Sequence, residues 1–239
     1  MGAAARPLSP RLPAALLELL FEILEQVEPV VSGTALADFA AAAGAPLVAA
    51  GIVKSHGHEA TDSSQEHDDR PLDLVWSAET GAYGYFHPLR GWVTVDADRT
   101  KRFRVDIEVV AAALLARFRG PTRSPASWLA DRVWELREIR IPHRTRRVST
   151  LLVRRAVDPL AWREIRKLLL SRPAANLRIL FSAARSADWP EDVPAGNVFI
   201  SMREVVSADG SLAVDPDVLA ARLDHPVSER VEGPASCHR

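Results

Sequence analysis

Apolar side chains recur at intervals of three and four residues near the start of the chain, between Pro13 and Pro29. This spacing predicts an amphipathic helix over residues 13–28, with a proline in its first turn and another just beyond its end. Three glutamates mark the opposite face of this helix: Glu18, Glu22 and Glu25. We expect such a helix to pack on a core or to join two copies of the chain.

Two shorter helices should follow, over residues 35–43 and 46–50. Thr34 is suited to cap the first helix and Gly44 to end it, and a glycine also follows the second. Residues 55–71 contain almost no apolar side chains, which predicts an exposed, mobile loop.

Short β-favouring runs separated by turn residues begin after residue 71. These runs cover residues 74–76, 83–86, 92–95 and 103–105. They predict a small antiparallel meander, followed by a helix over residues 106–118.

The second half of the chain alternates strand and helix patterns. Ser124 and Pro125 predict a short helical turn that ends at Leu129. Four strands and two helices are expected beyond it: strands over 133–141, 148–155, 177–183 and 198–201, and helices over 159–171 and 215–223. The unit from residue 148 to residue 183 predicts parallel strands joined by a right-handed helical crossover.

These elements predict an α+β fold with two domains. We expect a flexible arm over residues 1–12, and then a domain of N-terminal winged-helix-like helices with a small antiparallel sheet, the β-meander, over 13–120. A small α/β domain that contains the β-α-β unit should cover residues 121–223, and a flexible tail should cover 224–239.

Composition narrows the class of protein. The apolar fraction of 47% and charged fraction of 26% are ordinary for a globular chain, so disorder is not expected. Cys237 is the one cysteine, which rules out an intramolecular disulfide and a cysteine-rich zinc site. No apolar run reaches the roughly 20 residues that cross a bilayer. We therefore expect a cytoplasmic protein with no membrane partner and no cofactor.

The net charge of −1 hides an uneven distribution. Residues 1–98 carry a charge of −9 and residues 173–239 a charge of −4, whereas residues 99–172 between them carry +12. Almost all of this positive charge is arginine, whose planar guanidinium suits phosphate and carboxylate recognition. A local field of this kind can attract polyanions even when the whole chain is neutral.

The candidate contacts to nucleic acid lie in this basic segment. They are Lys101, Arg102, Arg104, Arg137, Arg140, Arg144, Arg146, Arg147, Arg154 and Arg155. Aromatic side chains that could stack on bases stand nearby in the sequence: Tyr83, Tyr85, Phe86, Trp92 and Phe103. Two alternatives remain open, because the basic segment could instead bind an acidic protein or pair with the acidic flanks of its own chain.

Residues 34–54 resemble the winged-helix branch of the helix-turn-helix superfamily. Ala40 and Gly44 lie where that motif has a small residue and a turn glycine. Residues 47–53 resemble the segment that leads from the third helix to the wing. The resemblance implies a DNA-binding fold. However, residues 46–50 offer no polar side chain to base edges, so we do not expect this helix to read sequence.

One group of side chains has the composition of a metal site. It consists of His56, His58, Glu59, His67, Asp68 and Asp69, a set that suits zinc. No apolar residues surround it to fix the ligands, so we favour a solvated acidic loop and expect no metal.

Searches for catalytic motifs found no nucleophile elbow, phosphate-binding loop or dinucleotide fingerprint. We therefore expect a non-enzymatic, nucleic-acid-associated protein, a regulator or a subunit of a DNA-handling assembly, that contacts the phosphate backbone through arginine. The alternative is a protein-interaction subunit with an acidic protein partner. A homo-oligomer formed through helix 13–28 is a further expectation.

Overall fold

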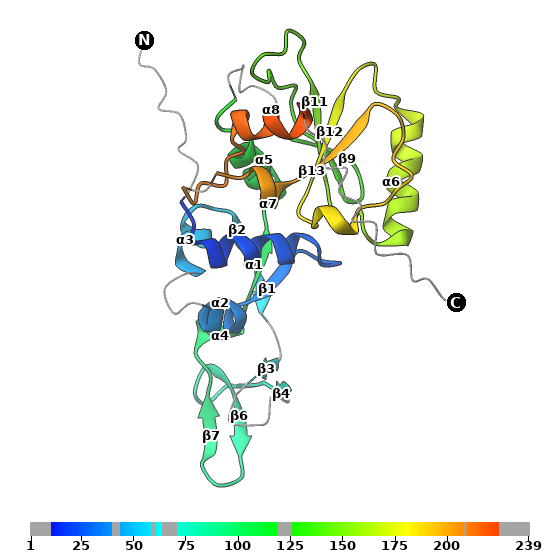
Figure 1. The fold of residues 1–239 in the computed structure, drawn as a ribbon. Helices are drawn as coiled ribbons and strands as arrows, with labels where there is room; N and C mark the ends of the chain where they lie inside the picture. The colour runs from blue at the N-terminus through cyan, green and yellow to red at the C-terminus, as the bar shows by residue number, and fades with distance from the viewer. Residues whose placement is uncertain are drawn as a thin grey trace, which may run out of the picture.

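A five-stranded sheet lies at the centre of the larger body of the molecule (Figure 1). The computed structural model describes residues 11–39, 44–58, 61–63, 71–118, 126–207 and 209–224. The strand order is β13-β12-β11-β10-β9, in which β11, β12 and β13 run parallel and β9 and β10 are antiparallel additions. The strands are β9 (Ser127–Ala130), β10 (Val133–Glu135), β11 (Ser149–Val153), β12 (Arg178–Ser182) and β13 (Asn197–Ser201).

One face of this sheet is covered by α6 (Pro159–Ser171). The helix begins as the sequence predicts, because the Asp158 carboxylate accepts hydrogen bonds from the two backbone N–H groups that follow Pro159. Its apolar side chains pack against alternate strand residues of β10 to β13. The cluster includes Leu151, Val153, Trp162, Ile165, Leu169, Leu180 and Phe199.

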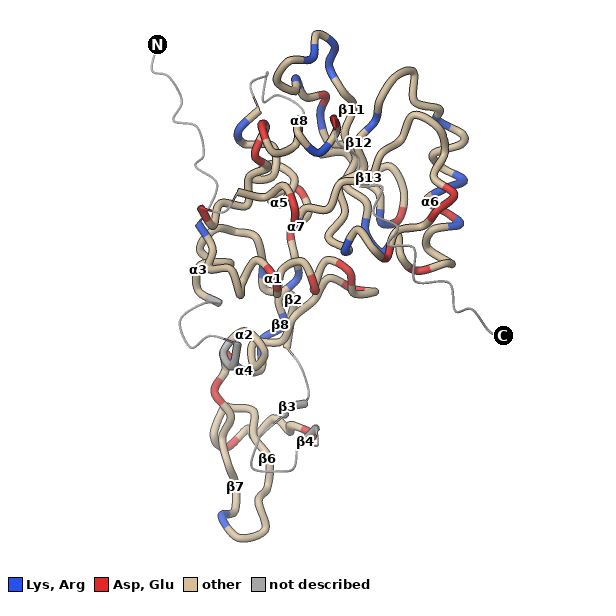
Figure 2. The backbone as a smooth tube through the Cα atoms, viewed as in Figure 1, with Lys and Arg blue, Asp and Glu red and all other residues tan. Residues whose placement is uncertain are grey.

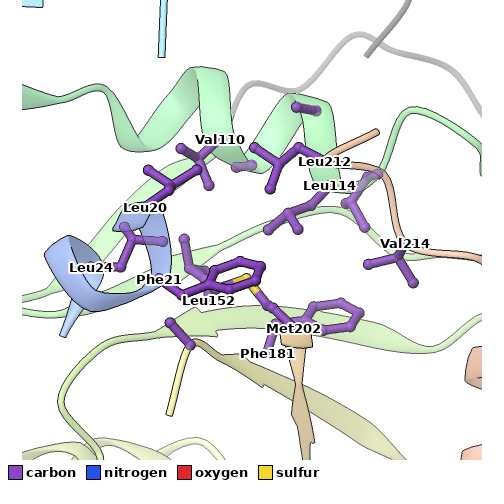
Figure 3. Close-up of a cluster of buried hydrophobic side chains, with 14 of the residues drawn as sticks. Leu20, Phe21, Leu24, Val110, Leu114, Leu152, Phe181, Met202, Leu212 and Val214 are labelled. Atoms are coloured by element: carbon purple, nitrogen blue, oxygen red, sulfur yellow. The ribbon is translucent and has the colours of Figure 1, made fainter. Parts of the chain in front are cut away.

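Four helices cover the opposite face, and Figure 3 shows part of the cluster of buried side chains there. They are α1 (Ala14–Leu24), α5 (Ile107–Leu114), α7 (Met202–Val205) and α8 (Pro216–Asp224). The intervening strand residues, such as Leu152 and Phe181, are fully buried among them. This core is continuous across the predicted boundary at residue 120, because helices from the first half of the chain cover strands from the second. Both faces of the parallel strands are therefore buried, which explains their uninterrupted apolar sequence.

The end of α1 is held by a buried arginine. Arg154, which follows β11, donates through Nε to the carbonyl of Leu24 at 2.6 Å and through Nη2 to the carbonyl of Gln26 at 2.8 Å. Burial lowers the pKa of this guanidinium to about 10, so it remains charged at neutral pH. Arg154 therefore supplies donors to carbonyls that the end of a helix leaves without partners inside the helix.

The acidic face of α1 is also bound within the chain. Arg203 of α7 forms ion pairs with Glu18 and Glu22, and its guanidinium lies 5.3 Å from the centre of the Phe21 ring. The apolar face of α1 is buried in the core. The acidic face of α1 stays exposed beside Arg203, so an oligomer through residues 13–28 remains a prediction.

Glu25 follows α1 and is enclosed at the same junction. Its Oε2 accepts the backbone N–H of Arg155 at 2.8 Å, while its Oε1 is buried without a hydrogen-bond partner among the described residues. Burial raises the pKa of this carboxyl, and the lowering effects of the Arg155 backbone N–H and of the Arg154 charge do not outweigh it.

A second, smaller sheet lies on the far side of α1. Its order is β1-β8-β2, antiparallel throughout, with β8 in the middle. The strands are β1 (Val30–Ser32), β2 (Val53–His58) and β8 (Lys101–Val105). Short helices precede two of them along the chain: α2 (Gly33–Phe39) and α3 (Gly44–Ala49) before β2, and α4 (Ala97–Thr100) before β8. The sequence pattern did not indicate β1, because three residues are too few to show an alternation.

Between β2 and β8 the chain extends away from the body. β3 (Thr61–Ser63) pairs with β4 (Pro71–Asp73), and β5 (Val75–Ser77), β6 (Ala82–His87) and β7 (Gly91–Thr94) form an antiparallel sheet that we call the projecting sheet (Figure 1). The predicted meander is confirmed for its first three strands. The fourth run, 103–105, belongs to the smaller sheet instead.

Several local predictions were wrong. Residues 55–71 are not entirely loop, because β2 continues to His58 and β3 and β4 form a ladder. Residues 127–130, predicted as a helical turn, form an edge strand paired with β10. Gly44 is the first residue of α3 rather than the end of the preceding helix.

The termini are described in part. Leu12, assigned to the flexible arm, is buried and donates its backbone N–H to the carbonyl of Gly210. A short 3-10 helix, η2 (Ser186–Asp188), and α7 were not predicted. The predictions for residues 1–10 and 225–239 lie outside the described residues. Among the residues described, no helix has the length and apolar content needed to cross a bilayer.

Replacing Arg154 with methionine should destabilise the fold by about 2–4 kcal/mol, because the buried carbonyl of Leu24 and the partly buried carbonyl of Gln26 lose their donor. Urea unfolding followed by circular dichroism measures this change. Arg147→Met is the matched control, since Arg147 is exposed, and its effect should stay within about 0.5 kcal/mol. Equal effects of the two substitutions would contradict the structural role of Arg154.

Glu25 predicts a pH dependence of stability. Because the folded-state pKa of Glu25 is raised, its protonated form favours folding, and that contribution is lost as the pH rises through the raised value. Wild-type protein should therefore lose stability relative to Glu25→Gln as the pH increases from 4.5. Urea titrations of both proteins up to about pH 8 measure the difference. A difference that is constant over this range would show that Glu25 titrates alike in the folded and unfolded states.

Candidate anion-binding surface

The most basic surface segment is the connection between β10 and β11, residues 140–147, which we call the basic loop. Backbone hydrogen bonds of 2.9 Å in both directions between Ile139 and Val148 close its ends. Ile139 and Ile141 are buried in the core, while Arg140 between them is exposed. Because side chains alternate in direction along this extended stretch, the two isoleucines anchor the loop in the core and Arg140 points to solvent.

The arginines of the basic loop differ in their partners. Arg144 forms an ion pair of 2.7 Å with Asp224 at the end of α8, and Arg146 donates to the amide oxygen of Asn176 at 3.1 Å. Arg140 and Arg147 are exposed and make no ion pair with any described residue. One of the four positive charges is therefore neutralised by a described carboxylate, and three face solvent without one.

A cleft of about 620 Å³ lies beside the basic loop. Its lining combines cationic with apolar side chains: Arg117, Phe118, Arg140, Ile141, Pro142, His143, Arg144, Thr145 and Pro216. No acidic side chain is among them, although Arg117 is bound from outside the cleft by Asp209 at 2.6 Å and Asp215 at 3.4 Å. An anionic group with an apolar neighbour, such as a nucleotide phosphate beside its sugar, fits this lining.

The basic residues of β8 lie at a separate place. Lys101 pairs with Asp98, and Arg102 approaches Glu28 at 4.0 Å. Arg104 is exposed and lies opposite Lys54 on β2, beside a hollow that also contains Asp106 and Glu108. Figure 2 shows β8 between α1 and α2, and a run of basic positions beside α8 at the opposite end of the body from the β6–β7 hairpin. The basic segment, residues 99–172, therefore does not form one continuous surface.

Three predicted contact residues serve the fold. Arg154 is 5% exposed and binds the end of α1. Arg155 pairs with Asp158 at the start of α6. Arg137 donates to the carbonyls of Leu115 and Phe118 after α5. These guanidiniums already bind groups of the protein, and Arg154 is buried as well, so they are poorer candidates for phosphate than the exposed arginines of the basic loop.

The predicted histidine cluster is described in part. His56 and His58 lie on β2, and the ring of His58 stacks on Tyr83 while its Nδ1 is 3.1 Å from Thr100 Oγ1. The other members of the set, residues 59 and 67–69, lie outside the described residues. Within the part of the chain that the structure describes, no three His, Cys, Asp or Glu side chains are grouped as a metal site would require.

The aromatic residues expected to stack on bases are not beside the basic loop. Four of them, Tyr83, Tyr85, Phe86 and Trp92, are on the projecting sheet, and Phe103 packs against the core. The aromatic residues of the projecting sheet and the basic loop are therefore at opposite ends of the molecule (Figure 2).

The sequence analysis missed Arg117, Asp224 and Arg203. Arg117 belongs to the cleft, Asp224 neutralises Arg144, and Arg203 holds α1. The partners of Arg203 are 181 and 185 residues away along the chain, a separation at which spacing carries no information. Arg117, in contrast, belongs to the basic segment, and its place after the predicted helix could have included it.

In comparisons with protein families, curated proteins and solved structures, no match to this chain was found.

The Arg144–Asp224 pair predicts a gain of anion binding. Asp224→Asn should release Arg144 and raise the salt concentration at which the protein elutes from a heparin column. Asp217→Asn is the matched control, since it removes the same charge from the same helix and has no arginine partner among the ion pairs found between described residues. Equal shifts for the two variants would mean that net charge alone, rather than Arg144, sets retention.

Proposed function

We propose that this protein binds nucleic acid through the phosphate backbone, with the basic loop and its adjoining cleft as the contact surface. The observation that carries the proposal is the exposure of three cationic side chains in one loop, Arg140, Arg146 and Arg147, none of them neutralised by a described carboxylate. Binding of this kind is electrostatic and independent of base sequence. Such a protein acts as a regulator or as a subunit of a DNA-handling assembly.

The loop geometry supports phosphate as the ligand. The guanidiniums extend from a backbone whose ends are fixed by the Ile139–Val148 bridge and whose interior is anchored by Ile141. A fixed backbone reduces the entropy lost when the arginines bind. Bidentate hydrogen bonds from arginine to phosphate oxygens are stronger than those between neutral groups.

The first half of the chain supports a winged-helix-like module as part of this proposal. Its elements follow the order α1, β1, α2, α3, β2, projecting sheet, β8, and the smaller sheet places β8 between β1 and β2. A β-hairpin extension directly after the third helix and its strand is the feature that names the winged helix. In this chain the extension between β2 and β8 would be the wing.

The module is not proposed to read bases. α3, in the position of a recognition helix, consists of Gly44–Ala49 and presents exposed alanine and valine side chains without a hydrogen-bonding group. Two duplexes of unrelated sequence should therefore bind with affinities within about threefold of each other.

The proposal is tested with the triple variant Arg140→Ala, Arg146→Ala, Arg147→Ala. Fluorescence anisotropy with a labelled duplex should show affinity reduced at least about tenfold at about 50 mM salt. The slope of log affinity against log salt should fall by about 2.7, as expected when three phosphate contacts are lost. Both effects should be the same for either duplex.

The matched control replaces Arg163, Lys167 and Arg185, three exposed cations elsewhere on the α/β unit, with alanine. It changes net charge equally and should leave the salt slope unchanged. Absence of binding by wild-type protein at about 50 mM salt would refute the proposal. Stronger binding to polyglutamate than to DNA would assign the basic loop to an acidic protein partner instead.

A further inference from the structure

The basic loop contains a tight turn over residues 141–144. The backbone N–H of Arg144 donates to the carbonyl of Ile141 at 3.2 Å, and His143, the third residue of the turn, has a φ of 61°. Pro142 in the second position and a left-handed residue in the third define a type II turn. Glycine or asparagine normally occupies that third position, because most side chains strain the backbone there. His143 therefore lies where glycine would be free of strain.

His143 differs from the other non-glycine residues with positive φ among those described. Arg132, with a φ of 69°, pairs with Asp131, and Arg155, with a φ of 57°, pairs with Asp158. The His143 side chain is exposed and makes no hydrogen bond or ion pair with any described residue. Backbone strain of this kind is concentrated at binding sites, where a side chain is needed in one direction. Contacts within the described chain do not account for the strain at His143.

The His143 side chain lines the cleft of about 620 Å³ beside the basic loop. Three segments that are distant in sequence form the walls of this cleft: Arg117 and Phe118 after α5, the basic loop, and Pro216 at the start of α8. A volume of this size is typical of sites that hold one small ligand, and a duplex is much larger. The ligand is therefore a single group or the end of a strand rather than a length of duplex.

The cations of the cleft differ in what they can offer a ligand. Arg117 and Arg144 are already paired with aspartates that lie outside the lining. Arg144 uses only Nη2 for this pair, so its Nε and Nη1 make no hydrogen bond with a described residue. Arg140 is exposed and has no ion pair with any described residue. The free donors that face the cleft are thus those of Arg140 and His143 and part of the Arg144 guanidinium.

These donors suit a phosphate at the end of a strand better than one within it. A terminal phosphate has three free oxygens and a charge of about −1.5 to −2 near neutral pH. A phosphate within a strand has two free oxygens and a single charge. Three free oxygens can accept from Arg140, Arg144 and His143 at the same time. Pro142 and Pro216 are half-buried in the lining and give apolar contact to an attached sugar.

We propose that this cleft binds the terminal phosphate of a nucleotide, with the attached sugar against the two prolines. This site rests on the proposed function, because the exposed arginines of the basic loop hold the adjoining backbone while the cleft takes the end of the strand. Two sources present the same phosphomonoester: the phosphorylated end of a nucleic acid and a free nucleotide. In the first case the protein is positioned at phosphorylated strand ends.

The test uses labelled duplexes with a short single-stranded overhang that ends in a phosphate or a hydroxyl group, made for the 5′ and the 3′ end. Fluorescence anisotropy at about 50 mM salt should show the phosphorylated overhang binding at least about fivefold more tightly at one of the two ends. A hydroxyl-ended overhang two nucleotides longer adds the same charge and is the matched control. It should bind within about twofold of the shorter one.

Equal affinities for all these duplexes would overturn the terminal-phosphate site and leave the proposed function standing. Absence of binding to every duplex at this salt concentration refutes the proposed function and this site with it.

Competition by adenosine monophosphate distinguishes the two sources of the phosphate. Displacement of the phosphorylated duplex at about 1 mM nucleotide assigns the cleft to free nucleotides as well, and no displacement assigns it to strand ends. Adenosine without phosphate is the control and should not displace the duplex. Equal displacement by adenosine overturns phosphate recognition by the cleft.

His143→Gly tests the strained residue itself. Glycine adopts a left-handed backbone without strain, so the urea midpoint should equal or exceed that of the wild type. The preference for the phosphorylated overhang should fall to within about twofold, because the imidazole is lost.

Arg132→Gly is the matched control for His143→Gly. It removes the side chain of another left-handed residue, which lies at the opposite end of β11 from the basic loop, and should leave the preference for phosphate unchanged. A His143→Gly variant that keeps the full preference, or one that is less stable than the wild type, overturns the assignment of His143 to the ligand.

Discussion

The docking of α1 against the five-stranded sheet is the constraint on which most of this structure depends. Parallel strands need both faces covered, and α6 covers one face alone. α1 and α5, from the first half of the chain, cover the other. Arg154 stands at this junction and donates to the carbonyls that end α1, so a charged group is buried where the two halves meet. The cost of burying it is offset by hydrogen bonds that no apolar side chain could make.

The docking of α1 also explains why the basic segment does not form a continuous basic surface. Arginine can donate to several carbonyls at once, and the fold uses Arg137 and Arg154 in this way. The described cations of this segment that remain exposed are divided among the basic loop, Arg104 on β8, and Arg163, Lys167 and Arg172 on and just after α6. The expectation that the acidic flanks would lie against the basic segment holds at Arg144 with Asp224, and the proposed phosphate contacts are the arginines left over.

Local patterns predicted much of the fold. Asp158 followed by proline predicted the start of α6, and the apolar runs predicted β11, β12 and β13, whereas the strand predicted over 133–141 is limited to Val133–Glu135. Where the predictions failed, long-range pairing had decided the outcome. β9 was predicted as a helical turn because its own residues do not show that it pairs with β10. β8 is not part of the meander because it pairs with β1, which lies thirty or more residues before the projecting sheet. Spacing did not reveal that Arg154 is buried or that Arg137 donates to carbonyls of its own chain.

By itself, the sequence determined most of the longer helices and strands, the Asp158 cap of α6 and the concentration of positive charge between two acidic flanks, because these depend on neighbouring residues and on composition. The tertiary structure decided which arginines face solvent and which bind carbonyls. It also decided that Glu18 and Glu22 pair with Arg203, and that the aromatic residues lie far from the basic loop. These outcomes depend on contacts between residues more than a hundred positions apart, which only the closure of the core brings together.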